Sequence, residues 1–222
     1  MDPKILNTMR ADWNARAREN ARHYVQNATA DWNERDFFRS GEINVANDIM
    51  PEMHRICGGG RSPLDLHMLE IGCGVGRMTR MLARIFGRVT AVDVSDEMLA
   101  EAKKNLAGFD NVALLLGDGA SFSGVPDGEC DFAFSFIVFQ HIPSIDVIRS
   151  YCRDVCRVLK PGSLFKFQVQ GSPEAARDAY DTWSGVPITL EQAQRLADDT
   201  GFALEAAEGA GTQYFWLRFR KP

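Results

Sequence analysis

The sequence predicts an α/β fold with a seven-stranded, mostly parallel sheet, one antiparallel strand, helices on both faces and an N-terminal helical segment. Three observations predict it. From residue 66 onward, short apolar runs alternate with segments of helical periodicity, which is typical of a parallel sheet. A glycine-rich turn follows the first apolar run. The last two apolar runs are joined by so short a turn that they must pair antiparallel.

The N-terminal part lacks runs typical of strands and is expected to be helical. Apolar residues recur at helical spacing over 11–25. A second helix is expected over 31–42, broken at Ser40-Gly41, and a third over 44–57, kinked near Pro51. Glycines 58–60 then form a linker. We therefore expect a helical cap or lid at 1–60 and an α/β domain at 61–222.

The α/β part divides into elements by periodicity and by cap residues. Ser95 or Asp96 begins one helix, Thr189 begins the last one, and Gly201 ends it. The expected strands are 67–72, 88–95, 111–118, 130–139, 163–170 and two within 203–221; the expected helices are 76–87, 96–108, 144–159 and 189–202. The helix at 144–159 is expected to stop at residues 160–162, Lys-Pro-Gly.

The glycine turn lies where open α/β sheets bind ligands, beyond the carboxyl end of a strand. Gly72 permits a tight turn, Gly74 lets a ligand approach the backbone, and Gly76 begins the helix. ATP or GTP would require a Lys-Ser or Lys-Thr pair after the glycines, and none follows. NAD would prefer GxGxxG, with its pyrophosphate on the helix N-terminus, but the third glycine comes one residue early.

Acidic residues narrow the choice of ligand. Glu70, two residues before the first glycine, suits a ligand with positive charge, and S-adenosylmethionine carries a cationic amino group and a sulfonium but no phosphate. Asp93 ends the second strand, where a carboxylate can accept ribose hydroxyls, although this fits NAD equally well. Asp118 follows the third strand and can accept the adenine amino group, or else close an Asx-turn.

Five stretches then occur in order: LEIGCGVGR, AVDVSDEMLAEAKKN, GDG, CDFAFSFIVFQHIP and RVLKPGSLFKFQV. With these the chain resembles the class I S-adenosylmethionine-dependent methyltransferases, in particular the small-molecule, type 11/25-like, ubiquinone-biosynthesis-type group. The resemblance covers about residues 65–170 closely and the tail in topology only. It implies a Rossmann-like fold, S-adenosylmethionine as cofactor and S-adenosylhomocysteine as product.

The resemblance also implies residue roles. Glu70 and the backbone of the glycine turn would contact the methionine moiety, Asp93 the ribose and Asp118 the adenine. Val94 and Met98 would flank the adenine, although Met98 suits the core of its helix face equally well. Phe136 and Gln140 would lie near the methyl group. The cofactor-binding set is Glu70, Gly72, Cys73, Gly74, Gly76, Arg77, Asp93, Val94, Met98, Gly117, Asp118, Gly119, Phe136 and Gln140.

An oxygen nucleophile usually needs a base to remove its proton. His141 is the histidine at the carboxyl end of an expected strand and is the candidate base, the alternative being a structural histidine that fixes the loop before Pro143. The connection at 171–190 is long enough to help build a substrate pocket. Candidate substrate contacts are Trp13, Tyr24, Trp183 and Tyr214.

Composition excludes several function classes. The net charge of −5 argues against nucleic-acid binding. Five cysteines without a CxxC pair indicate reduced thiols and no metal site. The N-terminus lacks the apolar segment of a signal peptide, and no run is long enough to cross a membrane. We expect a cytoplasmic protein with a small-molecule substrate, as a monomer or homodimer.

The expected function is methyl transfer to a small molecule, with oxygen as the favoured acceptor. Nitrogen and carbon acceptors stay open. Two alternatives from other classes also stay open. One is a noncatalytic regulator that binds S-adenosylmethionine. The other is an NAD-dependent oxidoreductase, which shares the glycine turn and Asp93 but would need a dehydrogenase catalytic set that the sequence lacks.

Overall fold

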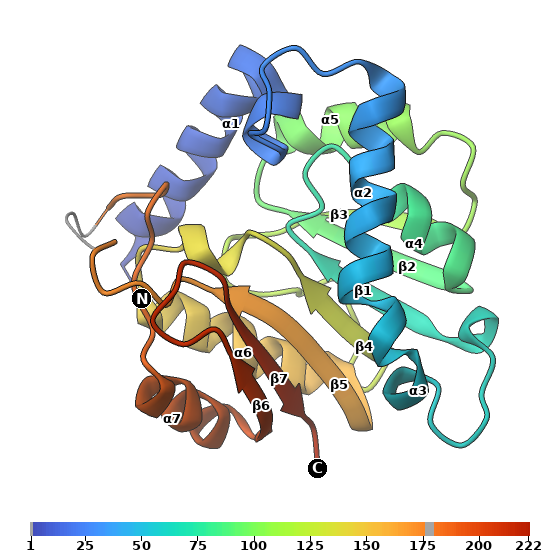
Figure 1. Ribbon diagram of the computed structural model, residues 1–222, viewed down its shortest axis with the longest axis vertical. Coiled ribbons are helices and arrows are strands. Elements are labelled where there is room, and N and C mark those ends of the chain that lie inside the picture. Colours follow the sequence, from blue (N-terminus) through green and yellow to red (C-terminus); the bar gives the residue numbers. More distant parts are fainter. Residues whose placement is uncertain (1, 176–179) are drawn as a thin grey trace. The chain divides into compact units, whose positions relative to one another are not determined.

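The computed structural model describes residues 2–175 and 180–222. Its strands form a seven-stranded sheet in the order β3-β2-β1-β4-β5-β7-β6 (Figure 1). The pairings described are parallel except those of β7, which runs antiparallel to both β5 and β6. The predicted fold class is therefore confirmed. The chain divides into two compact units, residues 10–116 and residues 1–9 with 117–222, and each is described by itself.

The first unit contains three parallel strands: β1 (His67–Ile71), β2 (Arg88–Asp93) and β3 (Val112–Leu116). All five residues of β1 are buried, as expected for a strand covered on both faces. Helices α4 (Thr79–Ile85) and α5 (Asp96–Asn105) connect the strands. Ser95 begins α5 as the N-cap, since its side chain accepts a hydrogen bond from the Met98 N–H.

Helix α1 (Pro3–Val25) begins earlier than expected and is interrupted at Asn20, whose backbone is extended (φ −164°, ψ 84°). The Asn20 side chain accepts a hydrogen bond from the His23 N–H (3.1 Å) and thereby caps the short segment after the kink. Helix α1 is thus two helical segments joined at one polar residue.

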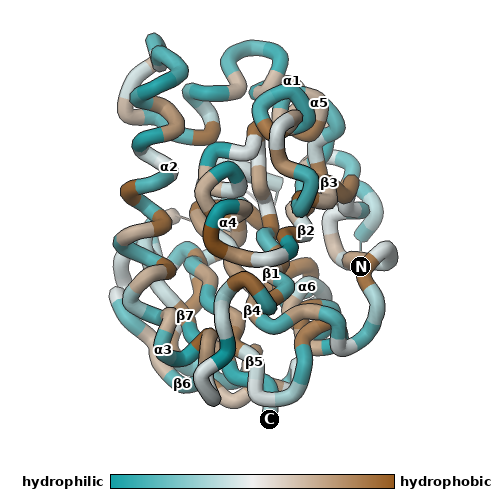
Figure 2. Tube along the Cα trace, turned by 90° about the vertical axis from the view of Figure 1, so that its right-hand side faces the viewer, coloured by the Kyte–Doolittle hydropathy of each residue, from teal (hydrophilic) through white to brown (hydrophobic). Residues whose placement is uncertain are grey.

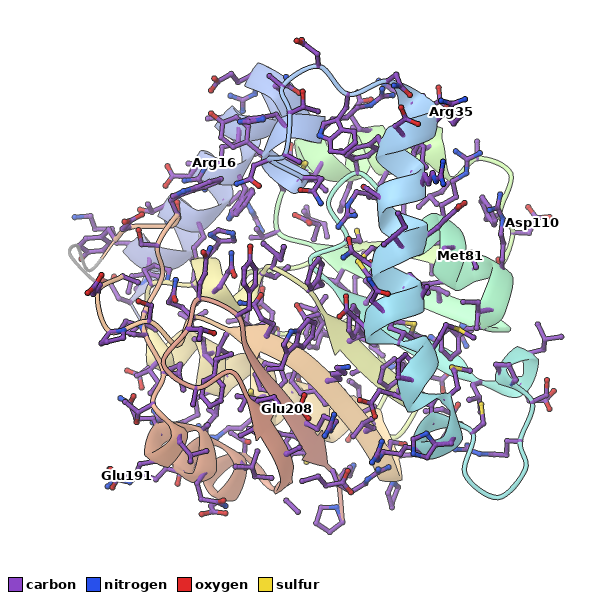
Figure 3. The ribbon with its side chains drawn as sticks, in the orientation of Figure 1. Arg16, Arg35, Met81, Asp110, Glu191 and Glu208 are labelled. Atoms are coloured by element: carbon purple, nitrogen blue, oxygen red, sulfur yellow. The ribbon has the colours of Figure 1, made fainter. Side chains whose placement is uncertain are left out.

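Helix α2 (Glu34–Asp48) begins at the N-cap Asn33 and is followed by the short helices η1 (Met50–Glu52), α3 (Met53–Ile56) and η2 (Pro63–Asp65). Apolar and polar residues alternate along α2 (Figure 2). Arg35 projects from its first turn into solvent (Figure 3).

The expected break at Ser40-Gly41 is wrong, because α2 continues through both residues. The Ser40 hydroxyl donates to the Phe37 carbonyl within the helix (2.6 Å). A Cβ atom on Gly41 would lie 2.3 Å from the Arg77 carbonyl oxygen, so glycine is present to allow close packing and not to end the helix. The helix ends instead shortly before Pro51, near the predicted kink.

The second unit contains β4 (Cys130–Ser135), η3 (Phe139–His141), α6 (Ile145–Val158), β5 (Leu159–Val169), α7 (Leu190–Thr200), β6 (Ala203–Glu208) and β7 (Phe215–Arg220). Helix α6 stops before residues 160–162, as expected, but these residues already belong to β5, which was expected to begin at residue 163. The reason is that Leu159, directly after α6, is extended, so that the chain passes directly from helix to strand.

The core of this unit is aromatic. Phe165, Phe167 and Phe219 from β5 and β7 are fully buried, and burial of each side chain contributes roughly 1.5–3 kcal/mol. Helix α7 begins with a capping box between Thr189 and Gln192 and ends at Gly201 in the left-handed region, as predicted. Glu191 in its first turn points into solvent (Figure 3).

The packing of α2 on the glycine turn predicts the effect of Gly41→Ala. Alanine favours a helix over glycine, but here its Cβ would collide with backbone, so we expect a loss of about 1–3 kcal/mol in the free energy of unfolding. Gly108→Ala is the matched control, since its Cβ would meet nothing within 4 Å, and it should be neutral. Urea denaturation measures both; equal stability of the two variants would contradict the packing.

Candidate functional site

The glycine turn joins β1 to α4 and needs glycine for its backbone. Gly72, Gly74 and Gly76 have φ values of 75°, 53° and 83°, which residues other than glycine rarely adopt. The N–H groups of Gly72 and Cys73 donate to the Val92 carbonyl (2.7 and 3.0 Å), which fixes the turn to β2. Gly76 does not begin the helix as expected: its positive φ keeps it in the turn, and α4 begins at Thr79.

Asp93, at the end of β2, connects the turn to the start of α5. Its Oδ2 accepts a hydrogen bond from the Gly74 N–H (2.8 Å), and its Oδ1 accepts one from the Ser95 N–H (2.9 Å). Burial raises the pKa of the Asp93 carboxyl, while both hydrogen bonds oppose the shift. A half-buried carboxylate with two backbone donors is therefore fixed beside the turn.

Glu70 is the second carboxyl beside the turn. It is 4% exposed, and its Oε2 accepts a hydrogen bond from the Thr79 hydroxyl (2.6 Å). Burial raises the pKa of Glu70 to about 7; the Thr79 bond and Arg77 lower it, and the charge of Asp93 raises it further. At neutral pH, Glu70 is therefore only partly ionised as long as no cationic ligand is bound beside it.

Arg77 lies at the end of the turn and is buried. Its Nη1 donates to the Ser40 hydroxyl (3.1 Å) and to the Asn44 side-chain oxygen (2.7 Å), both on α2. Its Nε is buried and has no hydrogen-bond partner among residues 2–175 and 180–222. Burial lowers the pKa of Arg77 to about 10, and the charge of Glu70 raises it. Arg77 therefore ties α2 to the turn and partly offsets the charge of Glu70.

Other predicted cofactor and substrate residues lie around this turn. Met98 is buried in an apolar cluster with Phe37, Phe38 and Val75, and Trp13 packs against that cluster. Val94 is half-buried, and its carbonyl accepts a hydrogen bond from Arg10. Tyr24 is also half-buried, and its hydroxyl donates to Glu19. Cys73 is buried.

Sequence reasoning missed Asn14, a buried polar residue of α1. The Ser95 hydroxyl donates to its Oδ1 (2.6 Å), and its Nδ2 donates to the Asp96 carboxylate (2.7 Å). Arg10 and Arg18 make the neighbouring contacts, to the Val94 carbonyl and to the Glu97 carboxylate. The signal that could have found this face is the four-residue spacing of these three polar side chains, which puts them on one side of a helix.

In the second unit, Asp118 lies between Gly117 and Gly119 and is exposed. Its Oδ1 accepts hydrogen bonds from the Ala120 and Ser121 N–H groups (2.7 Å each), and its Oδ2 accepts one from the Ser121 hydroxyl (2.6 Å). Asp118 thus closes an Asx-turn, and its role toward adenine stays a prediction.

Strand β4 ends at Ser135, before the expected end at Phe139, because Ile137 has a φ of 54°. That value is strained for a β-branched residue. The Ile137 N–H donates to the Gln168 side-chain oxygen (3.2 Å), and the Gln168 amide donates to the Gln140 side-chain oxygen (2.6 Å). Gln140 is therefore fixed by a buried glutamine of β5, which sequence reasoning missed.

His141 is buried, and both of its ring nitrogens have partners. Its Nδ1 contacts the Trp183 carbonyl, which can only accept, so this nitrogen carries the proton. Its Nε2 then accepts from the Gln140 amide (3.1 Å). The role of His141 as a general base stays a prediction, and to take a proton at Nε2 it would need Gln140 to turn away.

Trp183 and Tyr214 are exposed, at 41% and 48%. The Trp183 ring lies 5.2 Å from the His141 ring. Within the expected substrate connection 171–190, residues 176–179 lie outside the described residues.

The first unit brings together Glu70, the glycine turn, Arg77 and Asp93, and the second brings together Gln140, His141 and Trp183. Over residues 2–175 and 180–222, no group of three or more His, Cys, Asp or Glu residues is arranged to hold a metal ion. No helix within the same ranges is long and apolar enough to cross a membrane.

Comparison with known proteins shows what this chain is similar to. Residues 69–167 match the family described as "Methyltransferase domain". The 2-methyl-6-phytyl-1,4-hydroquinone methyltransferase of Synechocystis sp. is 32% identical over 118 residues, which are 53% of this chain and 36% of that protein. The malonyl-[acyl-carrier protein] O-methyltransferase of Serratia marcescens is 32% identical over 149 residues, 66% of this chain and 56% of that protein.

A solved structure, the DhpI–SAH complex, has a TM-score of 0.67 and 21% identity, covering all of this chain and 98% of that one. The chain spans about half the length, or less, of the curated relatives that it matches. The match to the methyltransferase-domain family covers residues 69–167, less than half of the chain, and the solved DhpI–SAH structure shares the fold of this chain.

The burial of Glu70 predicts a pH dependence of stability. Between about pH 4.5 and 7 the folded state keeps a proton that the unfolded state releases, so the free energy of unfolding falls as pH rises, by about 3 kcal/mol in all. Glu70→Gln keeps the shape and should remove this fall. Urea denaturation at pH 5 and pH 8 measures it, with exposed Glu101→Gln as control. Identical pH profiles of Glu70→Gln and the unmodified chain would contradict the buried carboxyl.

Proposed function

We propose that this chain is an S-adenosylmethionine-dependent methyltransferase (EC 2.1.1.-) that moves a methyl group to a small-molecule acceptor. One observation carries the proposal: two carboxyls, buried Glu70 and half-buried Asp93, lie beside a backbone turn built for close approach, and loss of solvent raises the pKa of both. A cationic ligand would be attracted to such a site, because its charge favours the ionised form of Glu70. The same carboxyls would repel the pyrophosphate of a dinucleotide, which disfavours NAD as the ligand.

The proposed roles follow the motif. Glu70 and the turn would bind the methionine part, and Asp93 would bind the ribose through the lone pairs that its two backbone hydrogen bonds leave available. Asp118 would reach the adenine, with Val94 and Met98 beside it. The other proposed contacts are Gly72, Cys73, Gly74, Gly76, Arg77, Gly117, Gly119, Phe136 and Gln140.

The cofactor supplies an electrophilic methyl group when it is bound. The chain's residues then have to align the acceptor and exclude water. With oxygen as the acceptor, a bond forms from that oxygen to the methyl carbon as the carbon–sulfur bond breaks. The electron pair passes to sulfur, and the acceptor's proton leaves to a base or to solvent. The Serratia relative is named an O-methyltransferase and the relative from Eremothecium gossypii a sterol 24-C-methyltransferase, so nitrogen and carbon acceptors stay open beside oxygen.

We also propose that residues 1–60 act as a cap over the glycine turn. The support is that Val25 of α1 is so close to the turn that a Cβ on Gly74 would lie 2.8 Å from its side chain. The contacts of Arg10, Asn14 and Arg18 with residues 94–97 fix the same helix to the loop after Asp93. Trp13 and Tyr24 would line part of the substrate-binding site. As a separate proposal, we expect the protein to act in the cytoplasm.

Calorimetric titration with S-adenosylmethionine, adenosine and NAD tests the proposal. We expect saturable binding of S-adenosylmethionine and no binding of NAD. Glu70→Gln should weaken S-adenosylmethionine about tenfold, since it loses one charge-assisted interaction, and leave adenosine unchanged because adenosine has no amino acid part. Glu101→Gln is the control. Binding of NAD alone would overturn the proposed cofactor, and an equal loss for both ligands would overturn the role of Glu70.

Methyl turnover over a panel of small hydroxylated acceptors separates an enzyme from a noncatalytic regulator. We expect transfer from S-adenosylmethionine to at least one acceptor. Tight binding of the cofactor with no turnover of any acceptor would favour the regulator.

A further inference from the structure

Phe136 and Trp216 form a stacked pair that we call the aromatic platform. Their ring centroids are 5.6 Å apart and their planes differ by 10°. Phe136 directly follows the last residue of β4, and Trp216 pairs with Gln168 near the carboxyl end of β5. Ligands of parallel sheets bind beyond the carboxyl ends of the strands, so the platform stands at the ligand end of this unit.

The platform differs from the aromatic core beneath it. Phe132, Phe134 and Phe139 are fully buried, whereas both platform residues keep part of their surface exposed. Among the described residues, the Trp216 indole N–H donates no hydrogen bond. A ligand that covered Trp216 would have to supply an acceptor, because a buried tryptophan N–H usually has a partner. The platform therefore offers an apolar ring surface together with an available donor.

The charge around the platform favours an electron-rich ring. The Lys166 ammonium lies 5.1 Å from the centroid of the Trp216 ring. The Lys166 cation would repel a second cation placed near the indole, so a cationic ligand would gain little affinity from this ring. A neutral or electron-rich aromatic molecule has no such penalty.

The platform is also held in place before any ligand arrives. Gln168 is fully buried, and its oxygen accepts from the N–H of Ile137, next to Phe136. Its amide donates to the Gln140 side chain and to the Gln213 carbonyl (2.9 Å), close to the start of β7. One side chain thus fixes both segments that carry the platform, which lowers the entropy lost on binding.

We propose that the aromatic platform binds the ring of a hydroxylated aromatic acceptor, with the Trp216 N–H donating to an oxygen on that ring, and that Trp216 determines specificity for such acceptors. This inference rests on the proposed function, because it names the acceptor class for the same methyl transfer. It assigns Trp216 a role that the sequence motifs do not include.

The test uses the full chain saturated with S-adenosylhomocysteine and two probes of similar shape, 2-naphthol and its saturated counterpart decahydro-2-naphthol. We expect the unmodified chain to bind 2-naphthol more tightly by calorimetry. Trp216→Leu should weaken 2-naphthol about tenfold and the saturated probe less, because both probes lose the hydrogen bond and only 2-naphthol also loses the stacking. Trp216→Phe should keep the stacking and lose only the hydrogen bond, so it should weaken both probes to a similar, smaller extent. Phe109→Leu, which removes an aromatic ring from the other unit, should change neither probe.

Equal or tighter binding of the saturated probe, or unchanged binding of 2-naphthol by Trp216→Leu, would overturn the platform's role. Binding of S-adenosylhomocysteine is measured in the same titrations, and its retention by Trp216→Leu shows that the variant is folded. If Trp216→Leu fails to fold, equal affinities of the unmodified chain for the two probes still overturn the inference. Failure of the unmodified chain to bind S-adenosylhomocysteine would instead count against the proposed function.

Discussion

The hydrogen bonds of the Asp93 carboxylate are the interaction on which the first unit's site depends. One oxygen holds the glycine turn at Gly74 and the other holds the start of α5 at Ser95. Through the Ser95 hydroxyl the same chain of contacts reaches Asn14 and so α1. Removing a carboxylate from water is costly unless hydrogen bonds offset the loss, and for half-buried Asp93 desolvation raises the pKa while its backbone hydrogen bonds oppose the shift. A cationic ligand near this carboxylate would lower the remaining cost.

In the second unit, neutral side chains hold the loop after β4 in place. Gln168 fixes the strained Ile137 and the side chain of Gln140 with amide hydrogen bonds and adds no net charge. Its neighbours at the strand ends are aromatic. The two units thus differ in character: buried carboxyls suit the charged part of a cofactor, and amides with aromatic rings suit an apolar acceptor.

Local patterns predicted much of this structure. The alternation of strands and helices, the capping box at Thr189 and the positive φ of Gly72 and Gly74 follow from short stretches of sequence. Gly41 was misinterpreted because its close neighbour, the Arg77 carbonyl, is far away in sequence. Trp216 was missed for the same kind of reason, since its position depends on the pairing of β7 with β5. Glu70 and Asp93 were found because they stand next to a recognisable turn.

The central claim is that the carboxyls beside the glycine turn receive the charged and ribose parts of S-adenosylmethionine. A crystal structure of the chain with S-adenosylhomocysteine tests it most directly. The claim predicts the ribose hydroxyls within hydrogen-bond distance of Asp93 and the ligand's amino group on the side of the turn that carries Glu70. A ligand bound elsewhere, or one that leaves Asp93 without contact to the ribose, would contradict it.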